Sequence, residues 1–169
     1  MKRISLWLLC LLFCGVHPVA AQGDAPNPLL GVWKLISWEA TRVSNGDTRL
    51  PFGKSLDGRI SYDAQGNMSE QVTQIHRQPF VTDFMGGARP DEMQLAFHTY
   101  VAYYGKYTFD MKGGMVVHHV EGSLFPNWVG TKQERQFAIE GQRLSLRSPP
   151  MAVNKGYKEV HTLTWEKIE

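Results

Sequence analysis

Short segments that alternate apolar and polar residues, separated by glycine-containing turns, run through most of the chain. Lys112-Gly113-Gly114 joins one pair of these segments, and Gly141-Gln142 joins another. Glycine adopts positive φ at little cost, so both sites are typical of tight turns between antiparallel strands. Eight segments are predicted to be strands, at residues 32–41, 59–63, 68–75, 103–110, 115–121, 132–140, 143–147 and 161–167. The chain is therefore predicted to be all-β.

One segment between these strands has a different pattern. Residues 76–100 begin as a loop, marked by Pro79, Gly86-Gly87 and Pro90, and continue as a helix that Asp91 would cap. Eight antiparallel strands and one short helix favour a closed β-barrel with the helix as a plug or lid, because closure removes unpaired strand edges. The interior of such a barrel is either filled by side chains or holds one small ligand.

The first 21 residues have the pattern of a cleavable signal peptide. Lys2 and Arg3 precede an apolar stretch over residues 4–16, which is too short to span a bilayer comfortably. Val19-Ala20-Ala21 then provides small residues for cleavage before Gln22. We expect export to a bacterial periplasm or secretion, a spacer over residues 22–28 and a barrel domain over residues 29–169. A retained N-terminal anchor is the alternative.

Removal of that segment changes the composition. Both cysteines, Cys10 and Cys14, lie in it, so the mature chain would contain no disulfide and no cysteine metal ligand. Taking Lys2 and Arg3 from the 18 basic residues leaves 16, equal to the 16 acidic residues. A neutral chain without a clustered positive face argues against nucleic-acid binding. No membrane span is expected after cleavage, and no nucleophile elbow, phosphate loop or zinc pattern indicates a cofactor or metal.

Several short motifs follow one another along the chain. The run begins with Gly31-Val32-Trp33, continues with Tyr103-Tyr104-Gly105-Lys106-Tyr107 and Pro126-Asn127-Trp128-Val129-Gly130-Thr131, and closes with Leu163-Thr164-Trp165-Glu166. This ordered set resembles bacterial and fungal lipocalin-like domain proteins over roughly residues 29–167. The resemblance implies a lipocalin-type barrel but no single activity. Some fungal members accompany small-molecule biosynthesis, which suggests hydrophobic ligands or isomerase-like roles.

Strand alternation sorts the first predicted strand into two faces. Trp33 is expected to point inward and to pack at the closed end of the barrel, as the tryptophan of Gly-x-Trp does in lipocalins. Regular alternation would place Ser37 and Glu39 further along the same inner face. Glu39 would then be a buried carboxylate that needs a partner or a proton. Alternatively, Glu39 lies solvated at the mouth of the barrel.

Two further polar side chains are predicted to lie inside. Arg135 shares a strand face with Phe137 and Ile139, which favours an inward position. It would either stack on Trp33 at the barrel floor or receive a ligand carboxylate or enolate. His118 lies on the more apolar face of its strand, where it would be either a hydrogen-bonded core residue or a general acid/base.

Aromatic residues supply the remaining candidate contacts. Tyr103 and Tyr107 share one strand face, whereas Tyr104 takes the other. Tyrosines of this kind either pack across strands or line a pocket with a flat apolar wall and a hydroxyl. Trp128 lies in a predicted loop and would either plug a barrel end or cap a ligand. The candidate ligand-binding residues are therefore His118, Arg135, Tyr104, Tyr107, Glu39 and Trp128.

Three functions are compatible with these residues. The leading hypothesis is an exported barrel that binds a small, mostly hydrophobic molecule. The second is an isomerase- or cyclase-type enzyme in which His118 moves a proton while Arg135 and Tyr104 stabilise an oxyanion. The third is a barrel with a filled interior that acts through its surface. A void beside His118 would favour either of the first two.

Overall fold

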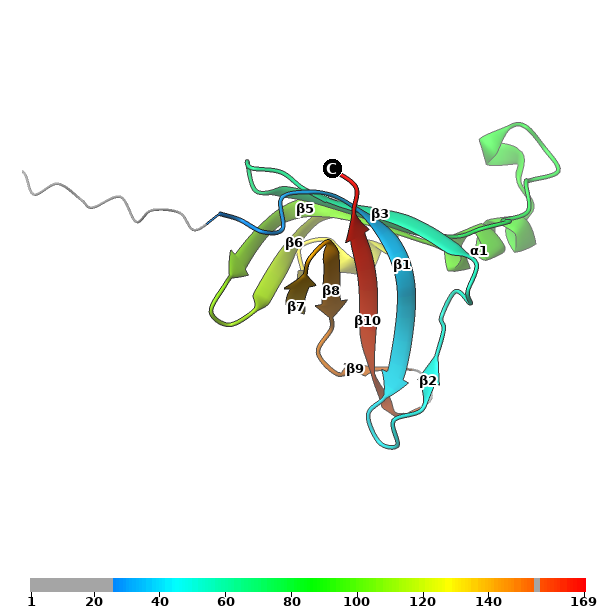
Figure 1. The fold of residues 1–169 in the computed structure, drawn as a ribbon. Coiled ribbons are helices and arrows are strands. Elements are labelled where there is room, and N and C mark those ends of the chain that lie inside the picture. Colours follow the sequence, from blue (N-terminus) through cyan, green and yellow to red (C-terminus); the bar gives the residue numbers. More distant parts are fainter. Residues whose placement is uncertain (1–25, 154–155) are drawn as a thin grey trace, which may run out of the picture.

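The computed structural model describes residues 26–153 and 156–169. It confirms the predicted all-β fold, an eight-stranded antiparallel barrel with one short helix (Figure 1). The barrel strands are β1 (Gly31–Arg42), β3 (Leu56–Tyr62), β4 (Asn67–Gln74), β5 (Tyr100–Asp110), β6 (Met115–Ser123), β7 (Lys132–Glu140), β8 (Arg143–Arg147) and β10 (Lys158–Lys167). Two strands of two residues each, β2 (Thr48–Arg49) and β9 (Met151–Ala152), were not predicted. The predicted signal peptide and residues 22–25 of the predicted spacer lie outside the described residues.

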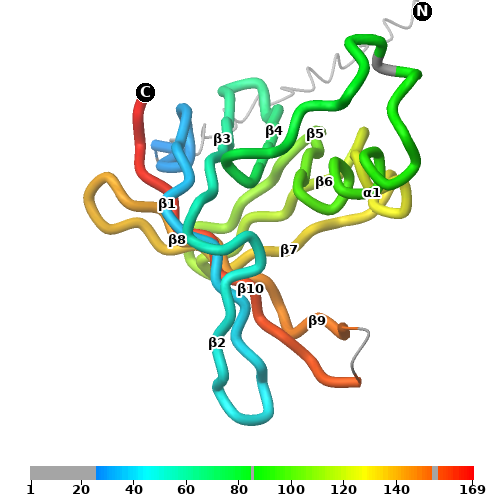
Figure 2. The backbone as a smooth tube through the Cα atoms, turned by 90° about the vertical axis from the view of Figure 1, so that its right-hand side faces the viewer, coloured from blue at the N-terminus to red at the C-terminus, as the bar shows by residue number. Residues whose placement is uncertain are grey.

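The sheet closes between its first and last long strands. Neighbouring strands follow one another from β1 through β8, and β10 then pairs with both β8 and β1. Closure satisfies the backbone donors and acceptors that an open sheet would expose at its edges. Figure 2 shows the hairpin of β1 and β2 and the strand β9 projecting from the same end of the barrel.

The helix does not plug the barrel. Helix α1 (Pro90–His98) begins at the proline, and Arg89 rather than Asp91 occupies the N-cap position. None of its residues is buried, and it lies beside the barrel next to the start of β5 (Figure 1). The expectation of a plug is therefore wrong, because α1 has no continuous apolar face to insert. In the part of the chain that the structure describes, no helix has the length and apolar character needed to cross a membrane.

A β-bulge in β1 changes which side chains face inward. Leu35 pairs with Trp165 and Ser37 pairs with Thr164, so Ile36 is an extra residue opposite β10. A bulge of this kind shifts the alternation by one residue. Trp33 and Leu35 are buried before the bulge, whereas Trp38 and Ala40 point inward after it. Regular alternation fails at this point.

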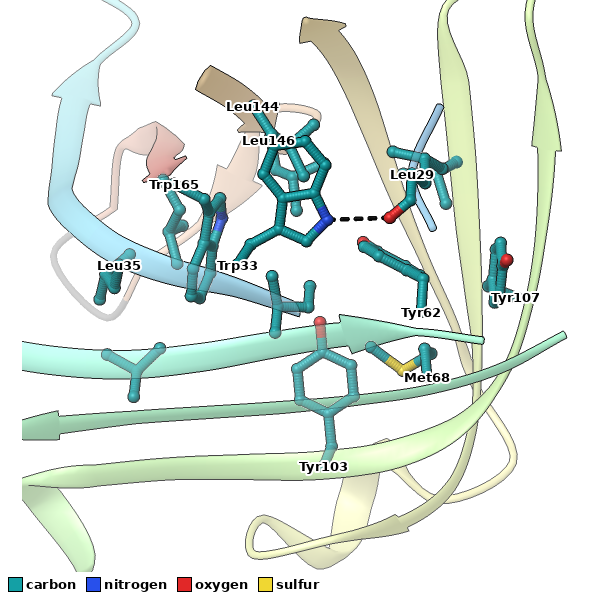
Figure 3. Packing of buried hydrophobic residues seen from close by; sticks show 14 of the residues in the cluster. Leu29, Trp33, Leu35, Tyr62, Met68, Tyr103, Tyr107, Leu144, Leu146 and Trp165 are labelled. Carbon is teal, nitrogen blue, oxygen red and sulfur yellow. Dashed lines mark hydrogen bonds between the residues drawn. The ribbon is translucent and has the colours of Figure 1, made fainter. Parts of the chain in front are cut away.

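A tightly packed cluster closes one end of the barrel. Trp33 and Trp165 are fully buried there beside Leu144 and Leu146 (Figure 3). The indole Nε1 of Trp33 donates a hydrogen bond of 2.8 Å to the carbonyl oxygen of Leu29, so its polar atom is satisfied. The prediction that Trp33 packs at the closed end is confirmed. The interior that remains open lies at the other end.

Candidate functional site

The barrel contains a cavity at the end opposite Trp33. Its volume is about 380 Å³, within the range of about 300–1,000 Å³ typical of small-molecule sites. The lining residues are Trp38, Glu70, Val72, Val101, Tyr103, Trp128, Gln133, Arg135, Met151, His161 and Leu163. A completely filled interior, the third hypothesis from the sequence, is therefore wrong for this barrel.

The lining combines an apolar wall with a few polar groups. Val72, Val101 and Leu163 supply aliphatic surface, and Trp38 and Trp128 supply aromatic surface. Such a wall favours flat or branched apolar molecules, because removing apolar surface from water is favourable by about 25 cal/mol per Å². The polar groups among the lining then determine which ligand atoms are accepted and where.

Strand alternation brings the two oppositely charged groups into this cavity. Glu70 and Val72 lie on the inner face of β4, where every second residue is buried. Gln133 and Arg135 lie on the inner face of β7, which further along carries Phe137 against the core. The inward orientation of Arg135 was predicted correctly. The cavity consequently contains one carboxyl group and one guanidinium group.

Four buried side chains form a hydrogen-bonded chain that ends at the cavity. The hydroxyl of Tyr62 lies 2.8 Å from Nε2 of His118, and Nδ1 of His118 lies 2.8 Å from the hydroxyl of Tyr103. That hydroxyl donates a hydrogen bond of 2.7 Å to Oε2 of Glu70. Tyr62 and Tyr103 both point into the barrel interior (Figure 3). Both nitrogens of His118 are therefore partnered, as in the core-residue alternative.

When Glu70 is ionised, only one order of donors and acceptors is possible along these four side chains. A carboxylate only accepts, so Tyr103 donates its single hydrogen to Glu70. The oxygen of Tyr103 must then accept from Nδ1–H of His118. Neutral imidazole carries one N–H, which leaves Nε2 of His118 as the acceptor for the Tyr62 hydroxyl. This order fixes the tautomer of His118.

Burial shifts the pKa values along this chain. Loss of solvation raises the pKa of Glu70 from 4.5, while the Tyr103 hydrogen bond and the Arg135 charge act in the opposite direction. Loss of solvation, followed by the charges of Arg135 and His119, lowers the pKa of His118 to about 3. Burial also raises the pKa values of Tyr62 and Tyr103 well above 10. His118 is therefore a neutral link at physiological pH.

Arg135 retains donors for a ligand. Its Nη1 donates to the carbonyl oxygen of Glu134 at 2.7 Å, and its Nη2 reaches Oε1 of Gln133 only at 3.4 Å. Among the described residues, no carboxylate lies within 4.0 Å of its guanidinium. The alternative in which Arg135 stacks on Trp33 is wrong: the cation over that ring is Lys167, whose Nζ lies 5.4 Å from the ring centroid.

A second polar network borders the cavity at its mouth. Trp38 donates from Nε1 to Nδ1 of His161 at 2.9 Å, which assigns the remaining ring proton of neutral His161 to Nε2. That nitrogen lies 3.6 Å from Glu159, whose carboxylate accepts two hydrogen bonds from Arg49. The Arg49 hydrogen bond lowers the pKa of Glu159, and burial lowers the pKa of His161. These contacts fix the orientation of Trp38.

Two candidate residues lie outside the barrel. Glu39 is exposed, because the bulge at Ile36 moves it off the inner face. The alternative in which Glu39 is solvated is the correct one, and the expectation of a place in the interior is wrong. Tyr104 is 57% exposed on the outer face of β5, where its ring lies against Gly122. Its neighbour Tyr103, one residue earlier on the strand, is the tyrosine that lines the cavity.

The other two aromatic candidates have different positions. Tyr107 is buried but does not line the cavity, since its hydroxyl donates to the carbonyl oxygen of Asp63 and accepts from Asn27. Trp128 lies in a short 3-10 helix, Pro126–Trp128, and lines the cavity. It stands edge-on to Tyr103, with ring centroids 5.7 Å apart. Of the two, only Trp128 is placed to contact a ligand directly.

The predicted catalytic trio does not meet at one surface. Arg135 lines the cavity, His118 is fully buried behind Tyr103, and Tyr104 lies on the opposite face of its strand. His118 and His119 also point to opposite faces of β6, one buried and the other within reach of Thr108 on the outside. Within residues 26–153 and 156–169, no group of three His, Cys, Asp or Glu side chains could hold a metal ion.

The residues missed from the sequence are Glu70, Tyr62 and the cavity role of Tyr103. Glu70 lies in the polar run Ser69-Glu70-Gln71, which carries no apolar signal for burial. Its alternation with buried Met68 and Val72 was the available clue. The Tyr62–His118 contact joins β3 to β6 across 56 residues, and no local pattern predicts a pairing of this range.

Comparison with known proteins agrees with this architecture. The model of a family described as a lipocalin-like domain matches residues 30–168. The chain is also similar to the 4'-hydroxy-3'-methoxypropiophenone carrier protein ppsC of Aspergillus oryzae. The two are 37% identical over 92 residues, which cover 51% of this chain and 82% of the relative. The chain thus belongs to the lipocalin-like domain family.

Proposed function

We propose that the protein binds and carries a small, mostly apolar molecule inside its barrel, with Arg135 receiving an oxygen of that ligand. The observation that supports this most strongly is the cavity of about 380 Å³, in which a guanidinium has no carboxylate partner among the described residues. A partly buried cation without an internal anion is best stabilised by an acceptor on the ligand.

The side chains that line the cavity support an aromatic ligand that carries an acceptor oxygen. Trp38 and Trp128 supply flat surfaces, and an aromatic ring packs well against such side chains. A carbonyl or other acceptor oxygen on the ligand would accept from Arg135. The printed name of the Aspergillus oryzae relative describes a carrier of an aryl ketone, which supports a ligand of this kind here.

The proposal is tested by titrating 4'-hydroxy-3'-methoxypropiophenone into the protein and measuring the heat of binding. We expect saturable binding at one site and quenching of tryptophan fluorescence, because Trp38 and Trp128 line the cavity. Arg135→Gln should weaken binding by about 10-fold or more, the effect of losing a charge-assisted hydrogen bond.

A matched arginine provides the control. Arg143 is exposed on β8 and does not line the cavity, so Arg143→Gln should leave the affinity unchanged. Val101→Trp, which adds an indole to the cavity wall, should abolish binding. Equal binding by wild type and Val101→Trp would contradict binding inside the barrel.

The location of this activity is a separate proposal. The pattern of residues 1–21 supports export, with the mature protein beginning at Gln22. N-terminal sequencing of the protein from fractionated cells of its own host would test this. A mature chain that starts at Gln22 outside the cytoplasm is expected, and a cytoplasmic chain that retains Met1 would refute export.

A further inference from the structure

Glu70 presents an unused acceptor to the cavity. Its side chain is 6% exposed, and Oε2 accepts the hydrogen bond from Tyr103. Its second oxygen, Oε1, accepts no hydrogen bond from any described residue, although the side chain lines the cavity. A carboxylate that is more than nine-tenths buried normally has its oxygens partnered, since a lone buried charge is costly. Oε1 is not one of the buried unpartnered atoms of the described residues, so it is open to the cavity, and its donor must come from water or a ligand there.

The hydrogen-bonded side chains behind Glu70 make this wall of the cavity an acceptor of hydrogen bonds rather than a donor. When Glu70 is ionised, Tyr103 commits its only hydrogen to Glu70, and the Tyr103 oxygen accepts from His118. The opposite polarity comes from Arg135, which offers only donors to the same space. One part of the cavity thus requires a donor on the ligand, and another requires an acceptor.

We infer that Glu70 Oε1 selects ligands by accepting a hydrogen bond from a ligand hydroxyl, while Arg135 donates to a second oxygen of the same molecule. The ligand class is a neutral, hydroxylated aryl carbonyl compound rather than a plain hydrocarbon or a fatty acid. This inference rests on the proposed function, and it names the specificity-determining residue. When Glu70 is ionised, a neutral ligand fits, because the carboxylate and the guanidinium balance each other in charge.

The site would discriminate against an analogue of the ligand that lacks the hydroxyl. Such an analogue displaces water from Glu70 but returns no donor, so Oε1 stays desolvated and unpaired. Sites built to hydrogen-bond a hydroxyl reject analogues without it far more strongly than apolar pockets reject a missing methylene group. A hydrogen bond to a charged acceptor corresponds to a preference of about 10- to 100-fold.

The test compares two probes with the same carbon skeleton. Binding of 4'-hydroxy-3'-methoxypropiophenone and of 3'-methoxypropiophenone is measured by calorimetry with wild type, Glu70→Gln and Glu70→Met. Wild type should prefer the phenol by about 10- to 100-fold. The preference should shrink in Glu70→Gln, whose amide is a weaker, neutral acceptor, and fall to about 2-fold or less in Glu70→Met.

The outcomes separate this inference from the proposed function. Equal binding of both probes by wild type would overturn the role of Glu70 and leave the carrier proposal intact. A wild-type preference that persists in both variants would also overturn it, because another group would then accept the hydroxyl. If wild type bound neither probe, both this inference and the proposed carrier function would be refuted. The wild-type comparison requires no variant, so it stands even if Glu70→Met does not fold.

Discussion

Replacing His118 with leucine should destabilise the protein through one specific unpaired hydroxyl. His118 is fully buried and joins Tyr62 to Tyr103. Leucine fills a similar volume but neither donates nor accepts a hydrogen bond. Tyr103 would keep its bond to Glu70, whereas the hydroxyl of Tyr62 would lose the partner that the structure shows for it.

The magnitude follows from that single loss. A buried donor left without an acceptor costs about 1–3 kcal/mol of the free energy of unfolding. Chains of this size unfold in urea with slopes of about 1–3 kcal/mol per molar. His118→Leu should therefore lower the urea midpoint by about 1 M, measured by tryptophan fluorescence and far-ultraviolet circular dichroism.

A double variant tests the physical reason. Tyr62→Phe removes the orphaned hydroxyl, so His118→Leu with Tyr62→Phe should be more stable than His118→Leu alone. His119→Leu, on the outer face of the same strand, should change stability by less than about 0.5 kcal/mol. If the double variant is as destabilised as the sum of the two single variants, the hydrogen bond is not the cause and the reasoning fails.

Three further predictions concern protonation. Above the raised pKa of Glu70, nitrogen NMR should find neutral His118 protonated at Nδ1, and it should find neutral His161 protonated at Nε2. His118 should remain neutral until the pH approaches its pKa of about 3, and titration of His118 near 6.5 would contradict this. Because folding raises the pKa of Glu70, the stability of wild type relative to Glu70→Gln should be greatest below pH 4.5 and should decline as the pH rises through the raised pKa; a pH-independent difference in unfolding free energy would show that Glu70 is not perturbed. Because folding lowers the pKa of Glu159, the stabilisation by Arg49 should be complete above pH 4.5 and should be lost as the pH falls through the lowered value. Urea denaturation of wild type and Arg49→Gln over a range of pH would measure this stabilisation. A difference in unfolding free energy that persists below the lowered pKa of Glu159 would refute the pairing.

The barrel could be predicted because its determinants are local. Glycine turns and alternation identified all eight long strands, with residues 132–140 and 143–147 matching β7 and β8 at both ends. The same alternation placed Arg135 correctly, since Phe137 and Ile139 on its face mark the core. Regular strands thus carry their orientation in their own residues.

The site could be predicted only in part, because bulges and long-range contacts decide the rest. One extra residue at Ile36 reversed the face of Glu39, and no pattern in that apolar run marks the bulge. Tyr104 was preferred to Tyr103, although only cross-strand packing determines which ring enters a cavity. Glu70 gained its position through Tyr103 and His118 on other strands, so its burial is a property of the folded barrel.

The measurement that tests the account most directly is a crystal structure of the protein with 4'-hydroxy-3'-methoxypropiophenone bound. We expect the ring between Trp38 and Trp128 inside the barrel, with one ligand oxygen at Arg135 and the hydroxyl at Glu70. A ligand bound on the outer surface, or an interior in which side chains have filled the cavity, would contradict a carrier that holds its ligand in the barrel.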